Sequence, residues 1–157
     1  MDQQAIFTLW KFGAGCPPET VIYVHGYNRD EAEAKEEFNR IQKSLGSSDY
    51  RVPLAGFSWS SKTYYLISQA NAENNGPLLA EFIRGFENEC PNTDIRIVAH
   101  SLGASVIKSS IVNLERDLTA GNNDSKIIKS VHLLGVVISN QSIANNFAIW
   151  KCNGKGS

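Results

Sequence analysis

The sequence predicts an α/β fold, with a parallel β-sheet covered by helices on both faces. Two observations carry this prediction. Short apolar, β-branched runs alternate with longer segments in which apolar residues recur at helical spacing. The apolar runs are also continuous, as is typical of strands buried on both faces of a parallel sheet. At 157 residues the chain has the length of one domain, and we expect residues 1–157 to share a single core.

Four strands are predicted, over residues 20–24, 52–59, 95–99 and 130–138. The first contains the run Val21-Ile22-Tyr23-Val24, which stops at a histidine and a glycine. A helical segment lies between each strand and the next, so consecutive strands are joined by crossover connections. Such connections place the strands parallel and the helices against both faces of the sheet.

The predicted helices differ in how clearly their ends are marked. The first carries its apolar face over residues 34–45, with Asn28 and Asp30 as candidate caps and Gly46 as its end. The second begins at Gly76-Pro77, since proline is tolerated at a first helical position, and the polar residues 60–75 before it form a loop or a frayed helix. The third contains the apolar residues of 106–118 and stops at residues 121–123. A short final helix is expected over residues 140–150.

Charge, hydropathy and cysteine content exclude several classes of protein. Lys and Arg number 15 and Asp and Glu 16, with the signs interspersed, so we expect no nucleic-acid partner. No apolar run approaches the roughly 18 residues of a spanning helix. We therefore expect no transmembrane segment. The N-terminus also lacks a signal-peptide pattern, so we expect a cytoplasmic location, in the cytosol. Cys16, Cys90 and Cys152 are widely spaced and odd in number, which predicts reduced thiols.

The strongest signal of function is the segment from Ile95 to Ala104, in which an apolar strand leads into Ser101 and then into a helix. A serine on such a sharp turn needs small residues two positions before and two positions after it, so that strand and helix can approach each other. Ala99 and Gly103 meet this requirement. The segment therefore predicts a nucleophile elbow, with an ordinary helix-capping serine as the weaker interpretation.

Two further motifs precede the elbow along the chain. His25-Gly26-Tyr27-Asn28 follows the first strand, and Gly56-Phe57-Ser58-Trp59 ends the second. Together with Ala99-His100-Ser101-Leu102-Gly103, they resemble the α/β-hydrolase superfamily, in particular small lipase- or esterase-like serine hydrolases of prokaryotes and their viruses. The resemblance covers residues 20–140. It implies Ser101 as the nucleophile and the backbone N–H groups of Tyr27 and Leu102 as an oxyanion hole, worth about 3 to 4 kcal/mol per donor.

The base that would activate Ser101 is not evident in the sequence. The superfamily order along the chain is serine, acid and then histidine, and the only histidine after Ser101 is His132. His132 lies inside a predicted strand and is expected to be structural. His100 is expected to pack beside the turn. His25 is expected to brace the oxyanion loop, with a catalytic role as the weaker alternative.

No carboxylate is well placed either. Asp117 and Asp124 lie at the far end of the helix after the elbow, and the fourth strand is followed by Asn140, which could orient an imidazole but not stabilise its charge. The sequence thus predicts a minimal or truncated α/β-hydrolase fold, without the C-terminal strands that carry the catalytic histidine. A sheet that ends early leaves an exposed edge, which favours a homodimer through that edge.

Two functions follow from these patterns. The first is a serine esterase that cleaves a small acyl ester or a similar apolar substrate through an acyl-serine intermediate. The second is a catalytically inert hydrolase-fold module that binds a ligand or a protein. Trp59, Tyr64 and Tyr65 could line an acyl pocket, although core positions are favoured. No metal or other cofactor is expected, because the sequence has no H-E-x-x-H, P-loop or G-x-G-x-x-G motif.

Overall fold

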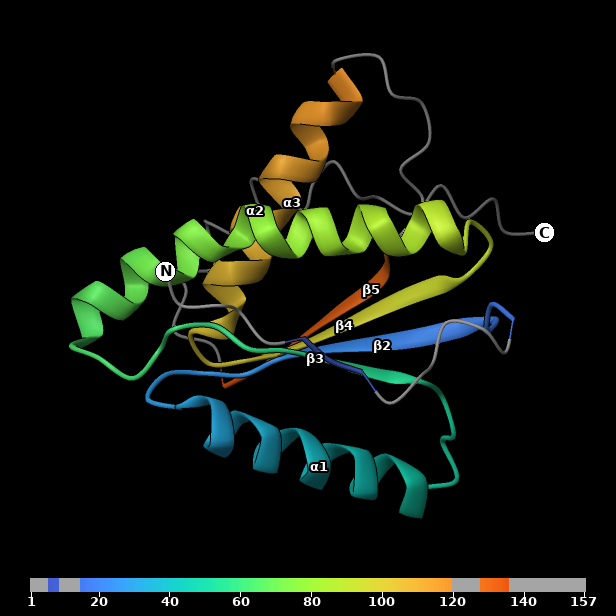
Figure 1. Cartoon of the computed structure of the whole chain (residues 1–157), viewed down its shortest axis with the longest axis horizontal. Coiled ribbons are helices and arrows are strands. Elements are labelled where there is room, and N and C mark those ends of the chain that lie inside the picture. Colours follow the sequence, from blue (N-terminus) through green and yellow to red (C-terminus); the bar gives the residue numbers. More distant parts are fainter. Residues whose placement is uncertain (1–5, 9–14, 120–127, 136–157) are drawn as a thin grey trace.

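The computed structural model describes residues 6–8, 15–119 and 128–135, and its central feature is a five-stranded sheet (Figure 1). The strands lie in the order β1-β3-β2-β4-β5, with β2, β3, β4 and β5 parallel and β1 antiparallel to β3. Their bounds are β1 Ile6–Thr8, β2 Glu19–Val24, β3 Leu54–Phe57, β4 Asp94–His100 and β5 Ile128–Leu134. The predicted parallel sheet is confirmed. The edge strand β1 escapes sequence prediction, because its three residues are too few to show a pattern.

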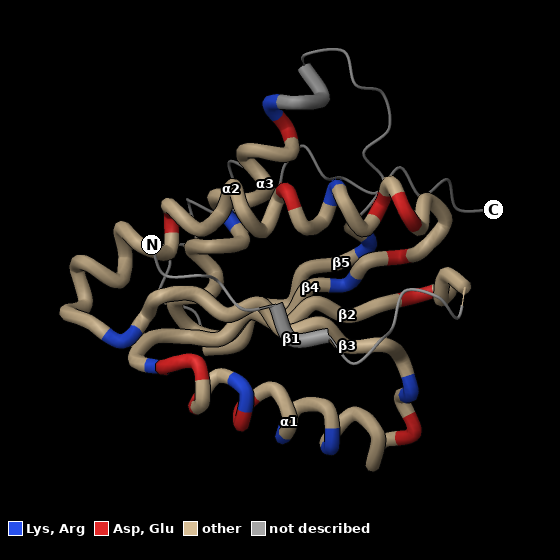
Figure 2. The backbone as a smooth tube through the Cα atoms, viewed as in Figure 1, with Lys and Arg blue, Asp and Glu red and all other residues tan. Residues whose placement is uncertain are grey.

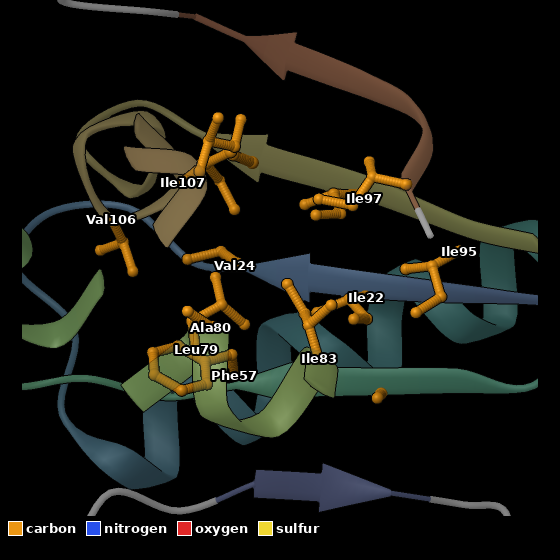
Figure 3. Close-up of a cluster of buried hydrophobic side chains, with 14 of the residues drawn as sticks. Ile22, Val24, Phe57, Leu79, Ala80, Ile83, Ile95, Ile97, Val106 and Ile107 are labelled. Atoms are coloured by element: carbon orange, nitrogen blue, oxygen red, sulfur yellow. The ribbon is translucent and has the colours of Figure 1, made fainter. Parts of the chain in front are cut away.

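The described helices form a layer on each face of the sheet. α1 (Glu31–Ser47) covers one face, and α2 (Tyr65–Glu89) and α3 (Gly103–Thr119) cover the other, which confirms the predicted arrangement (Figure 1). The main core lies between the sheet and the α2–α3 layer. In Figure 3, Ile22 and Val24 of β2 face Leu79 and Ile83 of α2, and each of these side chains is at most 1% exposed. Full burial of one such side chain stabilises the fold by about 1.5 to 3 kcal/mol.

α1 closes a smaller core on the opposite face of the sheet. Phe38 packs there with Val21, Tyr23 and Leu54. Gly56 of β3 makes room for the ring, because a Cβ added at Gly56 would lie 2.6 Å from Phe38 Cδ2. The exposed residues of α1 are mostly polar or charged, and Figure 2 shows acidic and basic residues interspersed along the helix. α1 is therefore amphipathic, as its sequence predicts.

A capping box begins α1. The Asp30 carboxylate accepts from the backbone N–H of Glu33, and the Glu33 carboxylate accepts from the backbone N–H of Asp30, each at 2.9 Å. Lys62 donates to both carboxylates, at 2.9 and 3.1 Å. Asp30 is thus confirmed as the helix cap. The predicted end at Gly46 is wrong, because this residue lies inside the last turn and Ser48 is the C-cap.

The predicted start of the second helix at Gly76-Pro77 is wrong, because α2 begins at Tyr65 and Pro77 lies inside it. A proline inside a helix leaves the carbonyl four residues earlier without its N–H partner, and here that carbonyl belongs to Glu73. Ser109 of α3 supplies a donor instead, since its hydroxyl donates to the Glu73 carbonyl at 2.6 Å. The polar stretch before Pro77 is therefore helical, and a contact from α3 makes the proline tolerable.

Gly76 brings α2 and α3 together at the same point. A Cβ added at Gly76 would lie 2.3 Å from Ser109 Cβ and 2.7 Å from the Ser109 carbonyl carbon. A larger residue would require one of the helices to shift. The two helix backbones therefore cross at close range, with Gly76 against Ser109.

A disulfide joins Cys16 and Cys90, whose Cα atoms lie 5.4 Å apart. The prediction of reduced thiols is wrong for these two residues, because the fold brings together cysteines that are 74 positions apart in the sequence. Cys152 lies outside the described residues. Beside the bond, Thr93 Oγ1 donates to the Pro17 carbonyl at 2.6 Å. The segment before β2 is thereby fixed to the connection between α2 and β4.

We expect Gly76→Ala to destabilise the protein by about 1 to 3 kcal/mol, because the added methyl group overlaps Ser109. Gly85→Ala is the matched control in the same helix. A Cβ at Gly85 would meet nothing within 4 Å, and the change should stabilise by about 0.5 to 1 kcal/mol. Urea unfolding followed by circular dichroism measures both free energies. Equal effects of the two substitutions would contradict the close helix crossing.

We expect the double variant Cys16→Ser, Cys90→Ser to lose about 2 to 4 kcal/mol of unfolding free energy, because the bond closes a long loop. Urea unfolding without reductant measures this loss. Titration of the unreduced, denatured chain should find one free thiol among the three cysteines. Three free thiols would show that the bond does not form.

Candidate active site

Ser101 lies at the turn between β4 and α3, in a left-handed backbone conformation with a φ of 49°. This conformation costs a residue with a side chain about 1 to 2 kcal/mol, so the surrounding contacts must impose it. One such contact is the hydrogen bond from the Ser101 N–H to the Leu134 carbonyl of β5, at 2.8 Å. A strained turn of this kind is the conformation expected of a nucleophile elbow.

Two glycines allow the elbow to approach the loop that follows β2. A Cβ added at Gly103 would lie 2.6 Å from the His25 carbonyl oxygen and 2.7 Å from the Val24 carbonyl oxygen. A Cβ added at Gly26 would lie 3.1 Å from Ser101 Cβ. Gly103, the small residue that the motif requires after the serine, therefore allows α3 to contact the end of β2.

His25 fixes the loop after β2 through both of its ring nitrogens. Nδ1 lies 2.9 Å from the Gly26 carbonyl oxygen, and Nε2 lies 3.0 Å from the backbone nitrogen of Trp59. Because that backbone N–H can only donate, Nε2 is the acceptor and Nδ1 carries the proton. Burial lowers the pKa of His25, in agreement with a neutral ring. Its lone pair is occupied, which leaves none to accept a proton from Ser101.

The indole of Trp59 completes this contact. Its Nε1–H donates to the His25 carbonyl at 2.9 Å, and the two rings stack with centroids 5.5 Å apart. Trp59 is 3% exposed and belongs to the core, as the sequence favours. The motif that ends β3 and the motif that follows β2 therefore bind each other.

Ser61 holds the next part of the same loop. Its buried hydroxyl donates to the Arg29 carbonyl and accepts from the Arg29 N–H, each at 3.0 Å. Its carbonyl accepts from the N–H of Asn28, which has a left-handed φ of 58°. The sequence does not reveal this role of Ser61, because a serine in a polar stretch carries no sign that it is buried.

The backbone N–H groups of Tyr27 and Leu102, the predicted oxyanion donors, belong to the two segments that meet where Gly26 approaches Ser101. Tyr27 belongs to the loop fixed by His25 and Ser61, and Leu102 directly follows Ser101. Across residues 15–119 and 128–135, neither N–H has a hydrogen-bond acceptor. α3 begins at the residue after Leu102, so its N-terminus adds positive potential at this point. The arrangement could stabilise a negative charge that develops beside Ser101.

The described contacts of the other two histidines do not involve the serine hydroxyl. His132 is exposed on β5, with Nε2 3.0 Å from Ser130 Oγ. His100 has Nδ1 3.4 Å from Glu37 Oε1, without a hydrogen bond between them. Within the described part of the chain, Ser101 Oγ has no hydrogen bond to an imidazole or a carboxylate. Among the described residues, the predicted nucleophile therefore has no base hydrogen-bonded to it.

The carboxylates and the amide considered from the sequence fall largely outside the described residues. The backbone of Asp117 lies near the C-terminal end of α3, but its side chain is not described, nor are Asp124 and Asn140. The role considered for Asn140 therefore stays a prediction, together with the short helix expected over residues 140–150.

Tyr64 and Tyr65 are exposed, at 83% and 41%, so the core positions favoured from the sequence are wrong for them. They begin an apolar segment at the start of α2, which continues with Leu66 and Ile67 at 77% and 51% exposure. The ring of Tyr65 meets that of Tyr27 edge-on, with centroids 5.4 Å apart. This exposed apolar segment, residues 64–67, borders the loop that carries one candidate oxyanion donor.

Among the residues that the structure describes, none of the helices is both long and apolar enough to cross a membrane. In the same ranges, no three His, Cys, Asp or Glu side chains are grouped so that they could hold a metal ion. The expectations of no metal and no other cofactor stay predictions for the chain as a whole.

The fold and the strained serine together define a class of protein. A parallel sheet, a serine on a left-handed turn from strand to helix, and a glycine-containing loop beside it are features of an α/β-hydrolase. Residues 17–142 match the family described as alpha/beta hydrolase of unknown function (DUF900). The chain belongs to this family, which confirms the resemblance seen in its motifs.

Similarity to solved structures is more distant. A Trichoderma reesei cutinase in complex with a phosphonate inhibitor is 18% identical, with a TM-score of 0.45 over 83% of this chain and 65% of the cutinase. A protein from Agrobacterium vitis S4 described as a candidate hydrolase is 15% identical, with a TM-score of 0.41 over 93% of this chain and 60% of that protein. The chain therefore spans less than two thirds of either structure. A comparison with curated proteins finds no match.

We expect Ser101→Gly to be more stable than Ser101→Ala by about 1 kcal/mol. Both substitutions remove Oγ, but only glycine is free of the side-chain strain at a φ of 49°. The comparison of the two variants by urea unfolding therefore isolates the strain of the turn. A more stable alanine variant would show that the elbow is not strained.

Proposed function

We propose that this protein is a serine hydrolase of the lipase or esterase type, which cleaves a carboxylic ester or a similar acyl bond. The observation that carries the proposal is the strained turn at Ser101, which lies against the Gly26 loop. Tyr27 follows Gly26 in that loop and Leu102 follows Ser101, and the backbone N–H groups of both are unpaired among the described residues. Residues held in strained conformations cluster at active sites, where the strain serves the chemistry.

In the proposed reaction, Ser101 Oγ attacks the acyl carbon of the ester, and its proton passes to a base. The carbonyl oxygen becomes negative, and the N–H groups of Tyr27 and Leu102 each stabilise it by about 3 to 4 kcal/mol. Collapse of this intermediate breaks the bond to the alcohol, which leaves with the proton from the base. Water then adds to the acyl-serine in the same way and releases the carboxylic acid.

The base of this reaction needs a source other than the three histidines of the chain. His25 is neutral with both nitrogens engaged, and His132 and His100 lie against Ser130 and Glu37. We therefore propose that a second chain in the assembled protein supplies the base, with Asn140 as a candidate to orient it. Without a base, an elbow of this kind retains about 10³ to 10⁴-fold acceleration over water.

An apolar substrate is supported by the exposed apolar segment. Residues 64–67 expose large apolar side chains beside Tyr27, whose backbone N–H is a proposed oxyanion donor. Burial of such side chains against an acyl chain would contribute about 25 cal/mol for each Å² removed from water. The substrate we propose is accordingly a small acyl ester with an apolar acyl group.

Two further expectations concern the setting of the protein. A homodimer through the edge of β5 is supported by Leu134, which is 47% exposed, and by β5 pairing only with β4 among the described strands. A cytosolic location stays a prediction. The Cys16–Cys90 disulfide counts against it, because such bonds persist mainly in oxidising compartments.

A fluorophosphonate probe tests the proposed nucleophile. We expect the intact protein to be labelled covalently and Ser101→Ala to remain unlabelled, because the probe reacts with an activated serine at the oxyanion hole. Ser60→Ala, at an exposed serine, should label like the wild type. Intact-protein mass spectrometry gives the extent of labelling, and hydrolysis of short p-nitrophenyl esters gives the activity.

Each other outcome of the probe experiment has a definite meaning. Equal labelling of Ser101→Ala and the wild type would exclude Ser101 as the nucleophile. Failure of every protein to label would favour the catalytically inert hydrolase-fold module, which is supported by the lack of a base at Ser101 among the described residues.

A further inference from the structure

Glu37 of α1 gathers side chains from three other parts of the fold. Its carboxylate accepts a hydrogen bond from the Tyr23 hydroxyl of β2 and another from Arg29 Nε, at 2.9 Å. The Nδ1 atom of His100, at the end of β4, lies 3.4 Å from the same carboxylate, within ion-pair distance but without hydrogen-bond geometry. The side chain of Glu37 is only 13% exposed. The nearly buried carboxylate of Glu37 therefore lies on the face of the sheet that α1 covers, next to the residue that precedes Ser101.

Two of these partners, His100 and Arg29, lie within two residues of a candidate oxyanion donor in the sequence. His100 precedes Ser101 and Leu102 in the chain, and a Cβ added at Gly26 would lie 3.0 Å from its Nδ1. Arg29 follows Tyr27 by two positions. Arg29 also donates through Nη1 to the Asn28 carbonyl, at 3.1 Å. One carboxylate therefore touches both the turn that carries Leu102 and the loop that carries Tyr27.

The charge on Glu37 is maintained despite its burial. Burial alone would raise the pKa of this carboxyl, but the hydrogen bonds from Tyr23 and Arg29 outweigh it and hold the pKa below its usual range. Burial and the neighbouring carboxylate raise the pKa of Tyr23, so its hydroxyl stays protonated as a donor. A buried ion pair is seldom more stabilising than apolar packing of the same size. Stability is thus a poor reason for a charge at this position.

We propose that Glu37 is a positioning residue that couples the two halves of the oxyanion hole, through His100 to the elbow and through Arg29 to the Tyr27 loop. This inference rests on the proposed function. Glu37 does not touch the substrate, and its effect passes through the positions of the Tyr27 and Leu102 N–H groups. An ion pair that merely holds α1 against the sheet would contribute to stability without affecting these two amides.

The variant Glu37→Gln tests the coupling, since it keeps the size of the side chain and removes its charge. We expect the rate constant of fluorophosphonate labelling at Ser101 to fall between about 10- and 100-fold, because small misplacements of oxyanion donors are costly. Glu36→Gln, at the exposed neighbouring position of α1, should label at the wild-type rate. An unchanged labelling rate in Glu37→Gln would overturn the proposal.

Amide hydrogen exchange gives a readout that does not depend on reactivity. In Glu37→Gln, exchange should accelerate at the hydrogen-bonded amides of Asn28 and Arg29 in the loop and of Ser101 in the turn together, while exchange in α2 stays as in the wild type. If the wild type is not labelled, the proposed function fails, and the exchange result still decides the coupling. Acceleration at only one of the two segments, or at neither, would overturn it.

The variant Arg29→Gln tests the same proposal if Glu37→Gln does not fold. The Arg29 side chain is 36% exposed, and Tyr23 still donates to Glu37 after the change. We expect faster exchange at the amides of Asn28 and Arg29, wild-type exchange at the amide of Ser101 and slower labelling of Ser101. Wild-type exchange at both segments would show that Glu37 does not hold the loop through Arg29.

Discussion

The contact of Gly103 with the backbone at the end of β2 is the constraint on which the rest of the site depends. Two carbonyl oxygens, those of Val24 and His25, lie closer to this glycine than any side chain would allow. α3 can therefore start directly beside β2, and the turn before it must be tight. The left-handed conformation of Ser101 follows from this geometry. The nucleophile position is thus set by backbone packing.

The strands and the elbow could be predicted because each leaves a mark in a short stretch of sequence. The continuous apolar run of β2 and the small residues Ala99 and Gly103 are examples. The start of α2 could not be predicted, because the rule for proline is local. The hydroxyl that makes Pro77 tolerable comes from Ser109, on another helix. The disulfide escaped for the same reason, since its two cysteines meet only in the folded chain.

The candidate site was predicted in part, and the part that was missed has a common physical cause. Ser101, Tyr27 and Leu102 belong to motifs whose spacing is visible in the sequence. Ser61 and Glu37 stand in polar surroundings that favour a solvated surface, yet both are buried against loops from other elements. Polar residues become supports of a site through contacts between distant segments. A single sequence does not display such contacts.

The hydrogen bond from the Ser101 amide to the Leu134 carbonyl makes the reactive turn a continuation of the sheet. The serine is thereby held by β5 as well as by the packing of the helix that follows it. A change in the twist between β4 and β5 would carry the turn with it. A strand added beyond β5 would stiffen this pair. An extension of the sheet beyond β5 would therefore also affect the position of Ser101.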